Sequence, residues 1–204
     1  MNGQTEPQTG PARKWIIFLV FATAVAAALW LWMVRFGTYH FAEVEKGVLY
    51  RDGNRGLREF RTALRKSNAK TVVMLNDDQE IQKEPFKTEL QLLEDHKIEV
   101  VRIPVKLGGY PTTDQVRQFL SVMNDRSKWP VLVHCAQGVR RTGMMVAAYQ
   151  ESAMGFDDAK AKSCILPWGR KPTSQTLADV QTFINVYDGK KRELTTMPTT
   201  NGGE

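Results

Sequence analysis

The chain has 204 residues, of which 42% are hydrophobic and 25% are charged, so it can form one well-packed domain and is not a disordered protein. Its net charge is +6, and no basic block with interleaved aromatic residues indicates a nucleic-acid partner. Two cysteines, Cys135 and Cys164, are too few for a disulfide framework, and their contexts offer no metal-ligand spacing.

The first predicted element is an apolar helix over residues 15–35. Trp15 to Val34 run for twenty residues without a charge, and as a helix they would span ~30 Å, the thickness of the hydrocarbon core of a bilayer. Tryptophans lie near both ends of this run, where their rings favour the membrane interface. A buried core helix and a cleaved signal peptide are the alternatives, but the apolar run is longer than a usual signal sequence.

We therefore interpret residues 15–35 as one uncleaved transmembrane anchor of a single-pass membrane protein. Arg13 and Lys14 precede the anchor and favour a cytoplasmic N-terminus, although Arg35 and Lys46 partly balance them. This reading places the folded domain on the non-cytoplasmic side of the membrane.

The polar leader, residues 1–14, is predicted to be disordered, and the similar tail, residues 190–204, is predicted to be flexible. Residues 38–189 form a single predicted domain in which strands alternate with helices. In chain order, we predict strands at 48–51, 70–75, 98–105 and 131–134, and helices near 57–66, 85–95, 114–123, 142–154, 157–164 and 174–187. This alternation indicates an α/β fold with a central, largely parallel sheet flanked by helices.

The motif VLVHCAQGVRRTG, residues 131–143, is the most informative stretch of the chain. Its apolar strand ends at Cys135, and in an open α/β sheet ligands bind at the carboxyl ends of the strands, beside the positive end of the following helix. The five residues after Cys135 can curl into a cradle with inward-pointing N–H groups, and glycine eases the turn; they are Ala136, Gln137, Gly138, Val139 and Arg140.

The planar side chain of Arg141 can hold two oxygens of a phosphate group in this cradle. The same positive surroundings would lower the pKa of Cys135 from ~8.5 and produce a nucleophilic thiolate. Arg140 could contact a second anionic group or be solvated. One loop is thus predicted to supply both the phosphate cradle and the nucleophile.

His134, Cys135, the five cradle residues, Arg141 and Thr142 resemble the signature of the cysteine-dependent protein tyrosine phosphatase superfamily, and the compact length is similar to its dual-specificity branch. The resemblance implies a reaction through a cysteinyl-phosphate, with no metal or other cofactor. It assigns Cys135 as the nucleophile and Arg141 as the clamp on the transition state. Thr142 would assist departure of the thiolate, and His134 would support the cysteine.

The chain departs from this family at the general acid. The family's usual aspartate would fall near residues 106–108, and none of these is acidic. Asp114 is the nearest substitute, although capping of a helix beside Thr113 is the favoured role for it. Without an acid, which is typically worth ~10²- to 10⁴-fold, the enzyme would be slow or would prefer substrates with good leaving groups, such as aryl phosphates or phosphoanhydrides.

These observations predict a membrane-anchored phosphatase acting on phosphorylated protein. Three alternatives stay open: an inositol phosphate or phosphoinositide phosphatase, a catalytically weak phosphate-binding pseudophosphatase, and a sulfur-transfer protein of the rhodanese kind. The five-residue gap to Arg141, followed by Thr-Gly, fits phosphate better than sulfur transfer. The oligomeric state is not predicted.

Overall fold

The computed structural model describes residues 11–167 and 174–195, in two compact units, residues 1–37 and 38–204. The described part of the first unit is one helix, α1 (Pro11–Phe36), and its segment Arg13–Leu31 has a mean hydropathy of 2.1 with no buried residues. By length and composition this segment could cross a membrane or serve as a signal sequence. Most of the predicted leader, residues 1–10, lies outside the described residues, whereas Pro11 to Lys14 begin α1.

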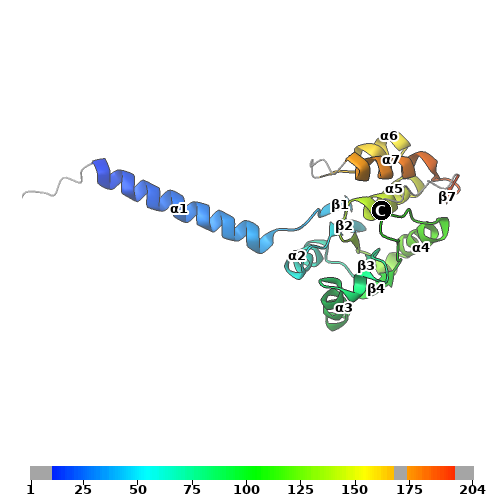
Figure 1. Ribbon diagram of the computed structural model, residues 1–204, viewed down its shortest axis with the longest axis horizontal. Coiled ribbons are helices and arrows are strands. Elements are labelled where there is room, and N and C mark those ends of the chain that lie inside the picture. Colours follow the sequence, from blue (N-terminus) through cyan, green and yellow to red (C-terminus); the bar gives the residue numbers. More distant parts are fainter. Residues whose placement is uncertain (1–10, 168–173, 196–204) are drawn as a thin grey trace, which may run out of the picture. The chain divides into compact units, whose positions relative to one another are not determined.

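The second unit is built on a five-stranded sheet in the order β1-β2-β5-β3-β4 (Figure 1). Its strands are β1 (Ala42–Glu45), β2 (Leu49–Gly53), β3 (Thr71–Met74), β4 (Glu99–Arg102) and β5 (Val131–Cys135). β2, β5, β3 and β4 pair in parallel with one another, and the edge strand β1 pairs antiparallel with β2. The predicted α/β fold with a largely parallel sheet is confirmed, and β5 is its central strand.

Helices cover both faces of this sheet (Figure 1). One face carries α2 (Leu57–Ser67) and α3 (Phe86–Asp95); the other carries α4 (Thr113–Asn124), α5 (Arg140–Ser152), α6 (Asp158–Ser163) and α7 (Ser174–Val186). Because side chains alternate along a strand, Leu132 packs with Phe60 of α2, whereas Val131 and Val133 pack with the α5 side. Burial on both faces explains why β5 is so apolar.

Three details differ from the sequence prediction. β1 was not predicted, because its sequence AEVE carries two carboxylates and resembles a loop. β4 is shorter than the predicted strand at 98–105, whose last residues turn toward the site. Within the tail expected to be flexible, β7 (Glu193–Leu194) forms a hairpin with the preceding β6 (Tyr187–Asp188), and Leu194 N–H donates to Thr113 Oγ1 (3.3 Å). Residues 196–204 of that tail lie outside the described residues.

The parallel strands bring their carboxyl ends to one edge of the sheet. Gly53 lies opposite Cys135, and Met74 lies opposite His134 in the strand register. Two short 3₁₀ helices, η1 (Glu80–Gln82) and η2 (Arg126–Lys128), complete the connections, and η1 follows β3 at this same edge. Segments far apart in the sequence therefore meet around the end of β5.

Candidate active site

Cys135, the predicted nucleophile, is the last residue of β5 and is only 2% exposed. The predicted cradle follows it as a short loop, and α5 begins at Arg140, so the helix N-terminus faces the thiol. Within the loop, Gly138 N–H donates to Cys135 Sγ at 3.2 Å. The structure therefore brings the predicted nucleophile, the predicted cradle and a helix N-terminus together.

Several contacts stabilise the thiolate form of Cys135. Burial alone would raise the pKa of the thiol, because it removes water from the charged form. The Arg141 guanidinium, the hydroxyl and N–H of Thr142, and the N–H of Gly138 outweigh that effect. The pKa of Cys135 consequently lies below its ordinary value, as a nucleophilic cysteine requires.

Gly138 is held tightly against β2. Its φ is +69°, and a Cβ at this position would lie 2.3 Å from the carbonyl oxygen of Asp52 and 2.6 Å from Gly53 N. Both the backbone conformation and the close approach require glycine. The loop thus rests directly on the neighbouring strand.

Arg51 supports this loop from below, a role that sequence reasoning missed. It is buried, and it donates to the carbonyl oxygens of Gly138 (2.8 Å) and Ile165 (3.2 Å). Burial lowers the pKa of Arg51 to about 10, which leaves it a cation at neutral pH. The available signal was an arginine in a short strand, directly after Leu49 and Tyr50.

Arg141 is positioned by Glu80 of η1, which sequence reasoning also missed. The guanidinium is bonded to both carboxylate oxygens, Nη1 to Oε2 at 2.5 Å and Nη2 to Oε1 at 2.8 Å, and Nη1 also donates to Val105 O at 3.1 Å. Burial of Glu80 is outweighed by these bonds, so its pKa is lowered and it stays ionised. These hydrogen bonds are made by Nη1 and Nη2, and Arg141 also lines the pocket beside Cys135.

His134 lies on the opposite face of β5, away from the pocket. It is fully buried, and its Nε2 lies 2.8 Å from Glu89 Oε1 of α3. Burial would lower the pKa of His134, but the charge of Glu89 and the Cys135 thiolate outweigh it, so the pKa is raised. The predicted supporting position of His134 thus has a specific acidic partner.

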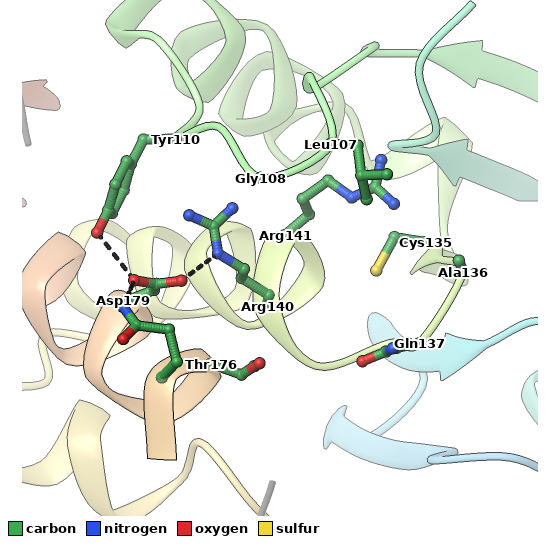
Figure 2. A pocket seen from close by; sticks show the side chains of 11 residues that line it. Leu107, Gly108, Tyr110, Cys135, Ala136, Gln137, Arg140, Arg141, Thr176 and Asp179 are labelled. Atoms are coloured by element: carbon green, nitrogen blue, oxygen red, sulfur yellow. Dashed lines mark hydrogen bonds and ion pairs between the residues drawn. The ribbon is translucent and has the colours of Figure 1, made fainter. Parts of the chain in front are cut away.

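A pocket of roughly 580 Å³ opens above Cys135. Figure 2 shows Cys135, Leu107 and the Arg141 guanidinium at one end of it, and Tyr110 and Asp179 at the other. The remaining lining residues are Gly108, Ala136, Gln137, Arg140, Gln175 and Thr176. Segments before β5, after β5 and on α7 therefore form its wall.

Arg140 is not solvated, as one sequence interpretation had it, but ties two parts of this wall together. Its Nε donates to Asp179 Oδ2 at 2.6 Å, and its Nη1 donates to the carbonyl oxygen of Gly109. The hydroxyl of Tyr110 also donates to Asp179, at 3.3 Å (Figure 2). No local motif marks Asp179, which comes from a helix nearly forty residues after the loop.

Asp114 does not line the pocket. Its side chain is 93% exposed on the first turn of α4 and lies 3.5 Å from Arg117. The helix is capped instead by Thr112, in a reciprocal capping box with Gln115. The cap therefore falls one residue before the predicted Thr113 and Asp114.

Comparison with known proteins identifies the family. Residues 40–164 match the family described as "DSP-PTPase phosphatase fused to NAD+ Kinase", which covers more than half of the chain. The chain belongs to this family. It is thus a phosphatase of the cysteine-dependent protein tyrosine phosphatase superfamily, in the dual-specificity-like branch that the motif resembles.

Curated relatives share only a short segment with this phosphatase. Probable NAD kinase 2, chloroplastic, of Oryza sativa subsp. japonica is 38% identical over 55 residues, and NAD kinase 2, chloroplastic, of Arabidopsis thaliana is 42% identical over 55 residues. These segments are 27% of this chain and 6% of each relative. The chain thus spans a small fraction of the relatives' length.

Solved structures share its fold at low sequence identity. The core catalytic domain of the PP-IP phosphatase Siw14 from S. cerevisiae has a TM-score of 0.61 and 17% identity, and TpbA from P. aeruginosa has 0.60 and 19%; each match covers 76% of this chain and 88% of the other. PTPMT1 in complex with PI(5)P has a TM-score of 0.54 and 16% identity, covering 71% of this chain and 94% of the other. These matches support the dual-specificity phosphatase fold.

Replacing Gly138 with alanine should disable the loop. A Cβ cannot fit against the Asp52 carbonyl, so the loop must shift and its N–H groups would no longer point into the site. We expect kcat/KM to fall by roughly 10²-fold, the effect of losing one oxyanion donor. Gly47→Ala is the matched control, because Gly47 has a similar φ of +73° with no atom within 4 Å. Equal losses in both variants would contradict this account.

Replacing Asp114 with asparagine should leave catalysis intact, because its side chain is exposed outside the pocket. We expect kcat/KM within about twofold of the parent chain from pH 5 to pH 8. A pH profile that loses its basic limb in Asp114→Asn would instead make Asp114 the general acid.

Proposed function

We propose that the protein is a membrane-anchored phosphatase that hydrolyses phosphate monoesters through a cysteinyl-phosphate intermediate. The observation that carries this proposal is the buried thiol of Cys135, whose pKa is lowered by the guanidinium and N–H groups around it. These same groups form an anion site directly beside the thiolate. Nucleophile and phosphate would therefore meet in the same loop.

In the first step, the Cys135 thiolate attacks phosphorus, the S–P bond forms and the P–O bond to the leaving group breaks. Arg141, fixed by Glu80, would stabilise the charge on the transferred oxygens together with the loop N–H groups. Because Glu80 occupies the far edge of the guanidinium, Arg141 is held in place before substrate arrives.

In the second step, water attacks the cysteinyl-phosphate, the S–P bond breaks, and orthophosphate and the thiolate are released. The Thr142 hydroxyl, which helps to lower the pKa of Cys135, would stabilise the thiolate as it leaves. The attacking water supplies both the oxygen and the protons of the product, so the cycle needs no cofactor.

The leaving group limits the choice of substrate. Among the described pocket-lining residues, Asp179 is the single carboxylic acid, and it lies at the end of the pocket away from Cys135, where it is bonded to Arg140 and Tyr110 (Figure 2). Substrates whose leaving group departs unprotonated are therefore favoured. Phosphotyrosine meets this condition, because a phenol with a pKa of ~10 is far more acidic than the alcohols of serine and threonine.

We therefore propose phosphotyrosine in a protein as the preferred substrate. Leu107 and the ring of Tyr110 offer apolar contacts for an aryl group in the pocket. A structure of TpbA is a complex with pTyr. An inositol pyrophosphate is the second candidate, because a phosphoanhydride is also readily displaced, and Siw14 is a PP-IP phosphatase.

The full chain in detergent should hydrolyse 4-nitrophenyl phosphate in EDTA, and Cys135→Ser should not. Against phosphopeptides of equal sequence, we expect phosphotyrosine to exceed phosphoserine by at least ~10²-fold in kcat/KM, the effect of a missing general acid. A preference for an inositol pyrophosphate would select the second candidate. Folded protein that binds vanadate without turnover would instead be the pseudophosphatase.

The membrane part of the proposal rests on α1. Its large apolar side chains are exposed to solvent along the helix, for example Trp15 at 65% and Phe21 at 67%, which is unfavourable in water and favourable in lipid. Basic residues before the span favour placing the catalytic unit on the non-cytoplasmic side.

The full chain should stay in the membrane pellet after alkaline carbonate extraction and keep residues 11–36 attached, as checked by intact mass. A soluble mature chain lacking these residues would mean that α1 is a cleaved signal sequence. A fluorescent reporter at the C-terminus that is active only in the cytoplasm would reverse the proposed orientation.

A further inference from the structure

A buried ionisable cluster lies beneath β5, on the face opposite the pocket. His134 and Glu89 are both fully buried, and His134 Nε2 lies 2.8 Å from Glu89 Oε1. Burying two ionisable groups is costly, and a well-packed apolar pair would often be as stable. The cluster therefore calls for a role beyond packing.

This cluster is connected to the nucleophile by two routes. His134 precedes Cys135 in the chain, and the two groups interact electrostatically. Asn54 forms the second route, because its side-chain amide donates to Glu89 Oε2 while its backbone N–H donates to Cys135 O at 3.2 Å. Glu89 thus contacts His134, the residue before Cys135, and Asn54, which is hydrogen-bonded to the carbonyl oxygen of Cys135.

We propose that Glu89 is a positioning residue that keeps His134 charged beneath Cys135, so that the buried Glu89–His134 pair helps to hold the nucleophile as a thiolate. The proposal rests on the proposed function only in taking Cys135 as the nucleophile. Glu89 does not line the pocket, so it would act through His134 and Asn54.

The other groups around His134 are compatible with this charge. Asp52, beside it on β2, is buried, and burial raises the pKa of its carboxyl to about 9, so it is neutral at pH 7. From α2, the Phe60 ring packs 5.3 Å from the imidazole, and Lys66 interacts with Asp52. From β3, uncharged Met74 lies opposite His134. Among these neighbours, Glu89 is the acidic side chain in contact with the imidazole.

The sign of the effect follows from the contacts. His134 interacts electrostatically with the Cys135 thiolate, whereas Glu89 is connected to Cys135 through His134 and Asn54. Without Glu89, burial would favour the neutral form of His134, and the Cys135 thiolate would lose the nearby positive charge of the imidazolium. If His134 instead stayed charged without Glu89, the pKa of Cys135 would fall.

The test is the pH dependence of iodoacetamide alkylation of the full chain in detergent, in a Cys164→Ser background so that one thiol reacts. We expect the midpoint of the parent chain below the ~8.5 of a free thiol. Glu89→Gln should move it upward by about one pH unit, a roughly tenfold slower reaction below the midpoint. Glu94→Gln, an exposed carboxyl on the same helix, should leave it unchanged.

His134→Gln should show the same upward shift, and the double variant should show no further one, because both changes remove the same charge. An unchanged or lowered midpoint in Glu89→Gln would overturn the proposal. So would an equal shift in Glu94→Gln.

Should Glu89→Gln not fold, NMR of the imidazole nitrogens of the parent chain decides the matter. The chain has three histidines, so His40→Gln and His96→Gln assign the signal of His134. We expect an imidazolium at pH 7.5, and a neutral ring would overturn the proposal. Because neither measurement uses a substrate, alkylation as predicted without phosphatase activity would contradict only the proposed function.

Discussion

A negative charge held inside the protein is the constraint on which the rest of this structure depends. The thiolate of Cys135 is buried, and burial opposes ionisation. Three positive groups stabilise the thiolate: Arg141 beside the sulfur, Arg51 beneath the loop, and the partial positive charge at the N-terminus of α5. Each cation is itself fixed by carbonyl or carboxylate oxygens, so the site is organised before a substrate arrives.

Much of this arrangement could be predicted from the sequence, because it is local. A strand ending at Cys135, a loop turning at Gly138 and a helix carrying Arg141 lie within one short motif, and their geometry follows from chain direction and spacing. The alternation of strands and helices likewise predicted the parallel sheet. The predicted boundaries of the helices and strands were less accurate. The extent of β4 depends on packing, and the start of the helix after Thr112 depends on side-chain hydrogen bonds.

The partners of these residues could not be predicted, because three-dimensional packing selects them. Glu80, Glu89 and Asp179 are three among 22 acidic residues, and nothing in their local sequence distinguishes them. Each becomes important only when the sheet brings its segment beside an arginine or histidine of the motif. Charged residues in a predicted helix are expected to be exposed to solvent unless the buried face of that helix is known.

The pocket wall has a different origin from the reacting groups. The candidate reacting groups come from one continuous loop, whereas the outer wall comes from the segment around Tyr110 and from α7, joined by the Arg140–Asp179 pair. Changes in these outer segments can alter what is recognised while the chemistry stays the same. Such modularity offers a reason why chains with 16–19% identity to this one share its fold while their structures are complexes with ligands as unlike as pTyr and PI(5)P.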